Sequence, residues 1–137
     1  FKILSINEDI VDENEIIIIN SYGMASNYLN FCKSVLMGKS LIKKLQSQSG
    51  QNPIEAAKLG CKIYHGPYIY NFQEIYSLLN QFNITEVIKD EVELSNKLNL
   101  DLNNTNNIDK KKIDAINELG TKILGNAYFE LKKISKL

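Results

Sequence analysis

A glycine-containing loop that leads into a short helix is the segment of this sequence best suited to chemistry. The loop holds Gly50, Gln51 and Asn52, and the expected helix begins at Pro53. Asparagine is a favoured N-cap, and proline suits the first helical position because no partner exists there for an N–H group. Backbone N–H groups at a helix start attract anions. The spacing therefore predicts an anion site over residues 50–55.

Glu55 stands three residues after the expected cap and could act in two ways. Its carboxylate could return to the N–H of Asn52 and close a capping box. It could instead accept hydrogen bonds from two neighbouring hydroxyl groups of a ligand. Helix physics alone favours the capping box, and both roles stay open at this point.

A second turn, Gly38-Lys39-Ser40, follows the apolar segment 34–37. A P-loop would need a glycine at position 33, where the sequence has Lys33, so that motif is absent. A glycine at the end of a strand still lets a ligand approach the backbone closely. A plain turn is the alternative interpretation.

A third turn, over residues 65–72, combines His65 with the pair Gly66-Pro67. His65 could serve as an acid–base group, although a lone histidine at a strand end is more often structural. The aromatic residues of this turn could stack on a base or could pack the loop itself. These residues are Tyr68, Tyr70 and Phe72.

Apolar segments of strand length alternate with helical patterns along the chain. The expected strands are 1–6, 15–20, 34–37, 61–64 and 84–88. The expected helices are 24–32, 53–59 closed by Gly60, 72–80 capped by Asn71, 91–99, and about 109–136 with a possible division at Gly120. This alternation predicts an open α/β sheet whose ligands bind beyond the carboxyl ends of the strands. The isoleucine run 16–19 predicts a strand buried on both faces.

Composition argues against several classes of protein. The chain has 16 basic and 16 acidic residues, which gives no support to a nucleic-acid-binding module. Every basic residue is a lysine, so a phosphate would be bound without arginine. One histidine and two separated cysteines, Cys32 and Cys61, argue against a zinc site and favour reduced cytoplasmic thiols. No apolar run reaches the ~20 residues of a membrane span. Because Phe1 opens directly into an apolar run, we expect a longer parent protein.

Taken together, the turns resemble the signature of the Kdo transferases over residues 15 to about 100. The family pattern runs approximately Gly-Gly-His-Asn-Pro-x-Glu, then Gly-Pro-His, then Asn-Phe, with an upstream Gly-Gly-Ser-Leu turn. The matching segments here are Gly38-Lys39-Ser40-Leu41, Gly50-Gln51-Asn52-Pro53-Ile54-Glu55-Ala56-Ala57, Gly60, Gly66-Pro67 and Asn71-Phe72. The joint spacing of these segments is specific.

This family moves Kdo (3-deoxy-D-manno-octulosonic acid) from CMP-Kdo onto a lipid A precursor at the cytoplasmic face of the bacterial inner membrane. The resemblance implies that residues 1–137 are one CMP-sugar-binding domain, a Rossmann-like open parallel sheet flanked by helices that forms the C-terminal half of a GT-B enzyme. The family's general base, acceptor site and membrane anchor belong to its N-terminal domain. We therefore expect no cofactor, no metal and no transfer by this chain alone.

The resemblance also implies roles for individual residues. Gly38 and Ser40 would lie near the donor phosphate, and Asn52, with the N–H groups of Gly50 and Gln51 around it, would hold phosphate or the Kdo carboxylate. Glu55 would bind the ribose hydroxyls of the cytidine, and Asn71 would border the sugar pocket.

The chain departs from the family pattern at several positions. Gln51 and Tyr68 replace histidines, and Ser49 replaces a glycine. The segment 20–25 lacks the acidic residue of the family's Asp-Thr-x-Gly-Glu-Leu, with Met24 at the glutamate position. Two other functions remain possible from the sequence. One is a different GT-B enzyme, such as a UDP-sugar epimerase, and the other is a non-catalytic α/β interaction domain.

Overall fold

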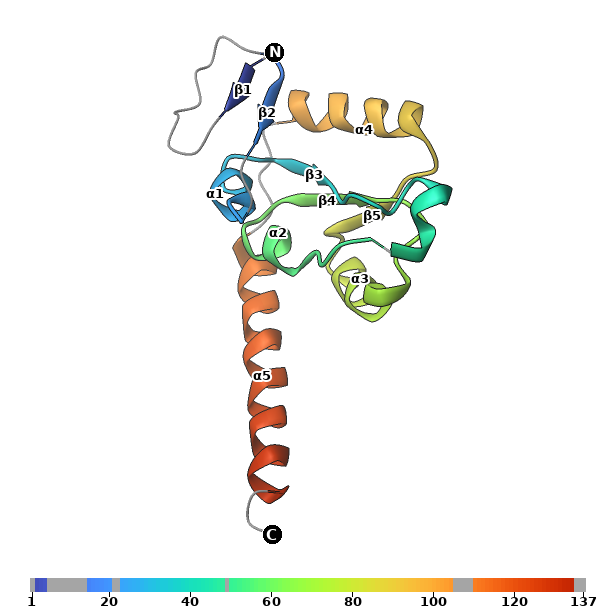
Figure 1. The fold of residues 1–137 in the computed structure, drawn as a ribbon. Coiled ribbons are helices and arrows are strands. Elements are labelled where there is room, and N and C mark those ends of the chain that lie inside the picture. Colours follow the sequence, from blue (N-terminus) through green and yellow to red (C-terminus); the bar gives the residue numbers. More distant parts are fainter. Residues whose placement is uncertain (1, 5–14, 21–22, 49, 105–109, 135–137) are drawn as a thin grey trace.

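The computed structural model describes residues 2–4, 15–20, 23–48, 50–104 and 110–134 (Figure 1). The elements are, in chain order, β1 (Lys2–Leu4), β2 (Ile17–Ile19), α1 (Ala25–Leu29), β3 (Ser34–Leu36), the 3-10 helix η1 (Lys43–Gln48), α2 (Ile54–Lys58), β4 (Lys62–His65), the 3-10 helix η2 (Tyr70–Phe72), α3 (Gln73–Gln81), β5 (Thr85–Val87), α4 (Glu91–Asn103) and α5 (Lys110–Ile134). The predicted alternation of strands and helices is therefore present.

A three-stranded parallel sheet organises the molecule, with strand order β3-β4-β5. Its register places Val35 opposite Ile63, and Ile63 opposite Thr85. Helices α2 and α3 lie on one face of this sheet and α4 lies on the other (Figure 1). The fold is thus mixed α/β, a small parallel sheet flanked by helices, which confirms the predicted fold class at this level.

The apolar core fills the space between the sheet and helices α2 and α3. Strand β4 alternates across the two faces, as an extended chain must. The ring of His65 packs on Tyr76 of α3, whereas the hydroxyl of Tyr64 reaches Asp101 of α4. The buried core residues are Met37, Ala56, Ala57, Cys61, Ile63, Tyr76, Leu79, Ile84 and Ile116.

The face of the sheet beneath α4 is held by polar contacts. No residue of α4 is buried. Ser34 and Tyr64 both donate hydrogen bonds to the Asp101 carboxylate, and Glu86 pairs with Lys97 of α4. Burial of Glu86 opposes its ionisation, but hydrogen bonds from Lys97 and a second lysine outweigh it and lower the pKa of this carboxylate. Helix α4 therefore covers the sheet without contributing to the core.

The isoleucine run does not form a buried strand, so that prediction was wrong. Strand β2 pairs in parallel with β1 in a separate two-stranded sheet. Ile18 is 47% exposed and Ile19 is 38% exposed. A β-branched run reports preference for extended backbone, whereas burial requires other elements to cover both faces.

Two helix predictions need correction. Helix α1 ends at Leu29, and Phe31 is 80% exposed, so the expected helix over 24–32 is shorter. The C-terminal segment is one helix of 25 residues, because Gly120 lies inside α5 without dividing it. A single glycine costs a helix interior only ~1 kcal/mol, which is too little to force a break.

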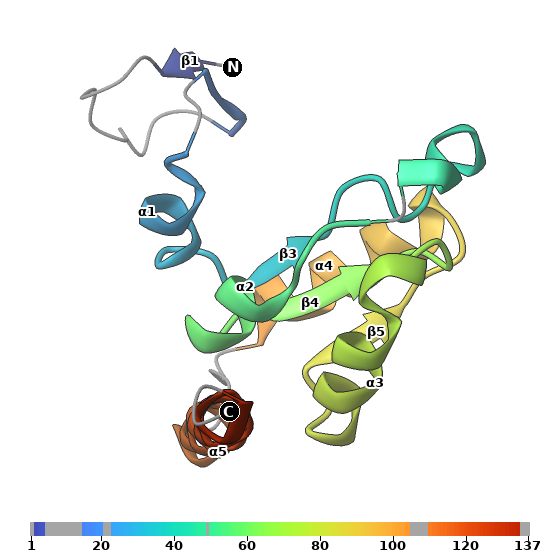
Figure 2. The ribbon, with the colours of Figure 1, turned by 60° about the horizontal axis from the view of Figure 1, so that its bottom comes forward.

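The described contacts between helix α5 and the core come from its first turns. Ile116 is buried in the core beside α2, and the later turns project away from the sheet (Figures 1 and 2). No described helix is long and apolar enough to span a bilayer. The predicted ends of the strand at 1–6 and of the helix at 109–136 lie outside the described residues, as does Ser49.

Candidate functional site

The turns singled out from the sequence meet at the carboxyl ends of β3 and β4. The N–H of Gly66 donates to Ser40 Oγ at 3.0 Å, and the N–H of Tyr68 donates to the Ser40 carbonyl at 2.9 Å. The N–H of Gly50 donates to the Lys39 carbonyl at 3.3 Å. Turns 38–40, 50–52 and 66–68 therefore form one connected surface beyond the strand ends, where parallel α/β sheets bind their ligands.

Ser40 joins two of these turns from a buried position. Its side chain is fully buried, and its hydroxyl donates to the Met37 carbonyl while accepting the Gly66 N–H. A Cβ on Gly66 would lie 2.2 Å from the Ser40 carbonyl oxygen, so the two backbones can approach only because position 66 is glycine. The protein itself thus uses the Ser40 hydroxyl as both donor and acceptor.

The loop 50–52 lies over this junction. Gly50 is buried with φ +69°, and a Cβ there would lie 3.2 Å from the Tyr68 carbonyl oxygen. The side chain of Gln51 lies beside Gly38, where an ideal Cβ would be 3.2 Å from Gln51 Oε1. The two glycines allow this packing, and Gln51 and Asn52 remain exposed at the surface.

Helix α2 begins at Ile54 with Pro53 at the N-cap position, one residue after the predicted start and cap. Asn52 Oδ1 accepts the N–H of Ile54 at 3.0 Å, and Pro53 has helical angles of φ −85° and ψ −6°. At the other end, Gly60 adopts φ +80°, and the N–H of Cys61 bonds back to the Ala56 carbonyl as in a Schellman motif. Local signals therefore fix both ends of this helix.

Glu55 does not close the capping box that helix physics favoured. Within the described residues, its exposed carboxylate makes no hydrogen bond to the Asn52 N–H. The side chain is thus available to a ligand. Because α2 has only five residues, its dipole is small, and an anion here would be held mainly by loop N–H and amide groups.

Asn71 occupies a different position from the one predicted. It lies within η2, and α3 begins after Phe72 with no side-chain cap. The helix start is a 3-10 turn, which leaves no capping position for Asn71. The prediction that Asn71 caps this helix was wrong.

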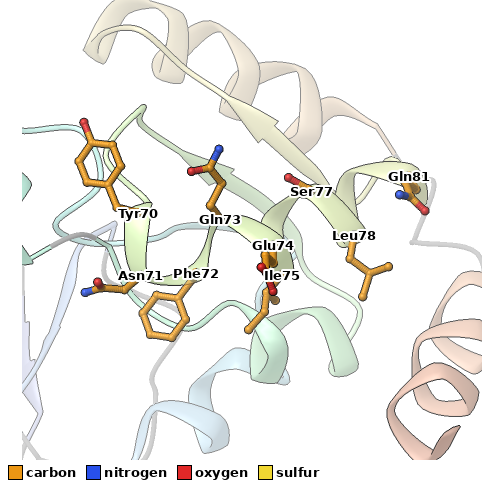
Figure 3. A pocket seen from close by; sticks show the side chains of 9 residues that line it. All are labelled: Tyr70, Asn71, Phe72, Gln73, Glu74, Ile75, Ser77, Leu78 and Gln81. Carbon is orange, nitrogen blue, oxygen red and sulfur yellow. The ribbon is translucent and has the colours of Figure 1, made fainter. Parts of the chain in front are cut away.

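Asn71 instead lines a hollow of about 770 Å³ along the outside of η2 and α3 (Figure 3). Gln73 and Ser77 point to one side of the helix, and Phe72 and Ile75 point to the other (Figure 3). Because η2 and α3 alone line this hollow, it is an open flank and not a cleft between elements. None of the other six predicted site residues lines it.

His65 is a structural residue in this arrangement. It is 3% exposed, its Nδ1 lies 2.8 Å from the Gly66 carbonyl oxygen, and its ring centroid lies 4.3 Å from that of Tyr76. Burial lowers the pKa of His65 despite the opposing hydrogen bond to Gly66. The ring is therefore neutral near pH 7, with the Nδ1 proton assigned from its carbonyl partner. Because the ring is buried, it cannot act as an acid or base toward a ligand at the surface.

Tyr76 contacts the candidate loop from inside the protein, a contact that the sequence did not reveal. It is 2% exposed, and its hydroxyl donates to the Gln51 carbonyl at 2.9 Å. Burial raises the pKa of this phenol to about 12, so it remains a donor at neutral pH. The spacing of apolar residues could assign Tyr76 to the inner face of its helix, but not to a partner 25 residues away.

The assembled surface offers exposed amide groups, loop N–H groups and one exposed carboxylate. Such a set suits a polar ligand that carries both an anionic group and hydroxyl groups. No group of His, Cys, Asp or Glu residues in the described ranges could hold a metal ion. In comparisons with known proteins, the chain matches no family model and no curated protein.

Proposed function

We propose that this chain is the nucleotide-sugar-binding half of a glycosyltransferase that moves Kdo from CMP-Kdo to a lipid A precursor. The observation that carries the proposal is the meeting of turns 38–40, 50–52 and 66–68 at the carboxyl ends of β3 and β4. These turns contain the segments that resemble the family signature. The finer fold assignment, a Rossmann-like half of a GT-B enzyme, belongs to the same proposal.

The local chemistry supports a role for each part of the surface. Loop N–H groups and the amides of Gln51 and Asn52 would hold the donor's phosphate or carboxylate. The exposed carboxylate of Glu55 would accept hydrogen bonds from the two ribose hydroxyls. Ser40 would act by joining the turns beneath the phosphate, because its own hydroxyl is already bonded on both sides. Asn71 would contribute to the sugar side of the site.

Catalysis in this proposal rests on positioning and on stabilisation of the departing CMP. The general base, the acceptor site and the membrane attachment belong to the family's N-terminal domain. The parent enzyme would work at the cytoplasmic face of the bacterial inner membrane, with CMP-Kdo and a lipid A precursor as its substrates.

Titration of the isotope-labelled 137-residue chain with CMP, UMP and Kdo tests this proposal. We expect CMP to shift the amide resonances of residues 38–40 and 50–55, and UMP to bind more weakly. A preference for UMP would favour a UDP-sugar enzyme. The absence of any nucleotide binding would favour an interaction domain, and either result would contradict the proposal.

A substitution at Glu55 tests the ribose contact. Wild-type protein should bind CMP more tightly than deoxy-CMP, and Glu55→Gln should lose most of that preference. Glu91→Gln is the matched control, because Glu91 is also an exposed glutamate in the first turn of a helix, α4. If the wild type and Glu55→Gln prefer CMP over deoxy-CMP equally, Glu55 does not bind the ribose hydroxyls.

A further inference from the structure

Tyr76 supports the loop 50–52 from inside the protein. Its ring is buried between the sheet and α3 and packs on the ring of His65, 4.3 Å between centroids. This packing fixes the position of the hydroxyl, which donates to the Gln51 carbonyl oxygen at 2.9 Å. One buried side chain therefore determines the direction of one exposed peptide group.

The geometry of the peptide bond carries this constraint to the next residue. The bond between Gln51 and Asn52 is trans, so its C=O and N–H groups point in opposite directions. Because the carbonyl of Gln51 points inward to Tyr76, the N–H of Asn52 points outward. Asn52 is exposed, and no described residue accepts a hydrogen bond from its N–H.

Among the backbone donors of residues 50–54, only the Gln51 N–H also lacks a described acceptor, and the Tyr76 hydroxyl does not hold its peptide. Pro53 has no N–H group, the N–H of Ile54 is bound by Asn52 Oδ1, and the N–H of Gly50 is bound by the Lys39 carbonyl. The N–H of Asn52 is thus an outward donor held in place beside the exposed amides of the loop.

We propose that Tyr76 is a positioning residue, whose hydroxyl holds the peptide between Gln51 and Asn52 so that the Asn52 N–H binds the phosphate of the nucleotide. This inference rests on the proposed function and adds the group that prepares the site for the anion. Tyr76 does not touch the ligand and acts through the peptide alone.

Tyr76→Phe tests the inference, since it removes one hydroxyl and keeps the ring. Tyr64→Phe is the matched control, because Tyr64 is also a buried tyrosine with a single described hydroxyl bond, made to Asp101 on the opposite face of the sheet. Affinities for CMP and for cytidine are measured for each variant, and their ratio isolates the contribution of the phosphate. A general loss of protein stability would weaken the binding of CMP and of cytidine alike.

We expect Tyr76→Phe to reduce the preference for CMP over cytidine by about five- to tenfold, the size of one net hydrogen bond. The Asn52 amide resonance of the ligand-free protein should also shift, whereas Tyr64→Phe should change neither quantity. The inference is overturned if Tyr76→Phe keeps the wild-type preference for CMP over cytidine, or if Tyr64→Phe loses as much of that preference. In either case, CMP binding by the wild type still supports the proposed function. If the wild type binds neither ligand, the proposed function fails and the inference fails with it.

Discussion

The hydroxyl of Ser40 accepts a hydrogen bond from the N–H of Gly66 at 3.0 Å, although the two residues are 26 positions apart in the chain. This bond joins the turn that follows β3 to the turn that follows β4. The Tyr68 N–H adds a second bond to the Ser40 carbonyl. The candidate site is therefore built on a buried junction between two loops.

Ser40→Ala should destabilise the protein, because it leaves the buried Gly66 N–H without its acceptor. We expect the free energy of unfolding to fall by ~1–3 kcal/mol in urea denaturation. Ser47→Ala is the control: Ser47 is exposed in η1, and its change should stay within about 0.5 kcal/mol. Equal unfolding free energies for the two variants would show that the junction contributes little.

Gly66→Ala should destabilise the protein more than Ser40→Ala, because the new Cβ would lie 2.2 Å from the Ser40 carbonyl oxygen and 2.4 Å from Leu41 Cα. Both neighbours are backbone atoms, so relief requires the turns to separate. We expect a loss of at least ~3 kcal/mol, or no folded protein, by circular dichroism and urea denaturation.

Gly120→Ala is the control for Gly66→Ala, and we expect it to have the opposite effect on stability. Gly120 lies inside α5 with nothing within 4 Å of the position that a Cβ would take, so an alanine meets no obstacle. The substitution should raise helix stability by ~0.5–1 kcal/mol through the higher helix propensity of alanine. A lower stability of Gly120→Ala in thermal unfolding experiments would contradict the open environment of this position.

The single histidine should make stability depend on pH in a defined window. Burial holds the pKa of His65 in the folded state below its unfolded value of about 6.5. The unfolded state therefore takes up the proton first as pH falls. Stability should be fully present above about pH 6.5 and decrease as pH drops towards the lower folded pKa.

Urea denaturation across this window measures the effect, and His65→Gln isolates it from the carboxylates. The variant loses the contact with Tyr76, so its stability is lower at every pH, but its dependence on pH over the window should be flatter than that of the wild type. Identical slopes for the two proteins would mean that His65 is as easily protonated in the folded state as in the unfolded state.

The two cysteines should react with alkylating reagents at very different rates. Cys32 is exposed, whereas Cys61 is fully buried and burial, with a smaller contribution from Cys32, raises the pKa of its thiol to about 11. Since the thiolate is the reactive form, native protein should take up one label, at Cys32, with the second following only on unfolding. Mass spectrometry of labelled peptides distinguishes the sites, and rapid labelling of Cys61 in native protein would contradict its burial.

Much of the local structure could be predicted from the sequence. The Asn52-Pro53 pair and Gly60 mark the two ends of α2, because caps depend on backbone groups only a few residues away. The order of strands and helices follows from the alternation of apolar patterns, and the parallel pairing of β3, β4 and β5 agrees with it. Asn71 shows the limit of this reasoning, since the 3-10 turn η2 removed the capping position that its residue type favoured.

Tertiary packing decided which strands are buried and which distant loops contact each other. The isoleucines of β2 have the residue type of a buried strand, but exposure depends on which elements cover them, and Ile18 remains 47% exposed. The sequence by itself determined where the candidate loops lie along the chain. Only the tertiary structure decided that Ser40 joins Gly66 and that Tyr76 directs the peptide of Gln51, because each bond joins a side-chain hydroxyl to a backbone group 25 or more residues away.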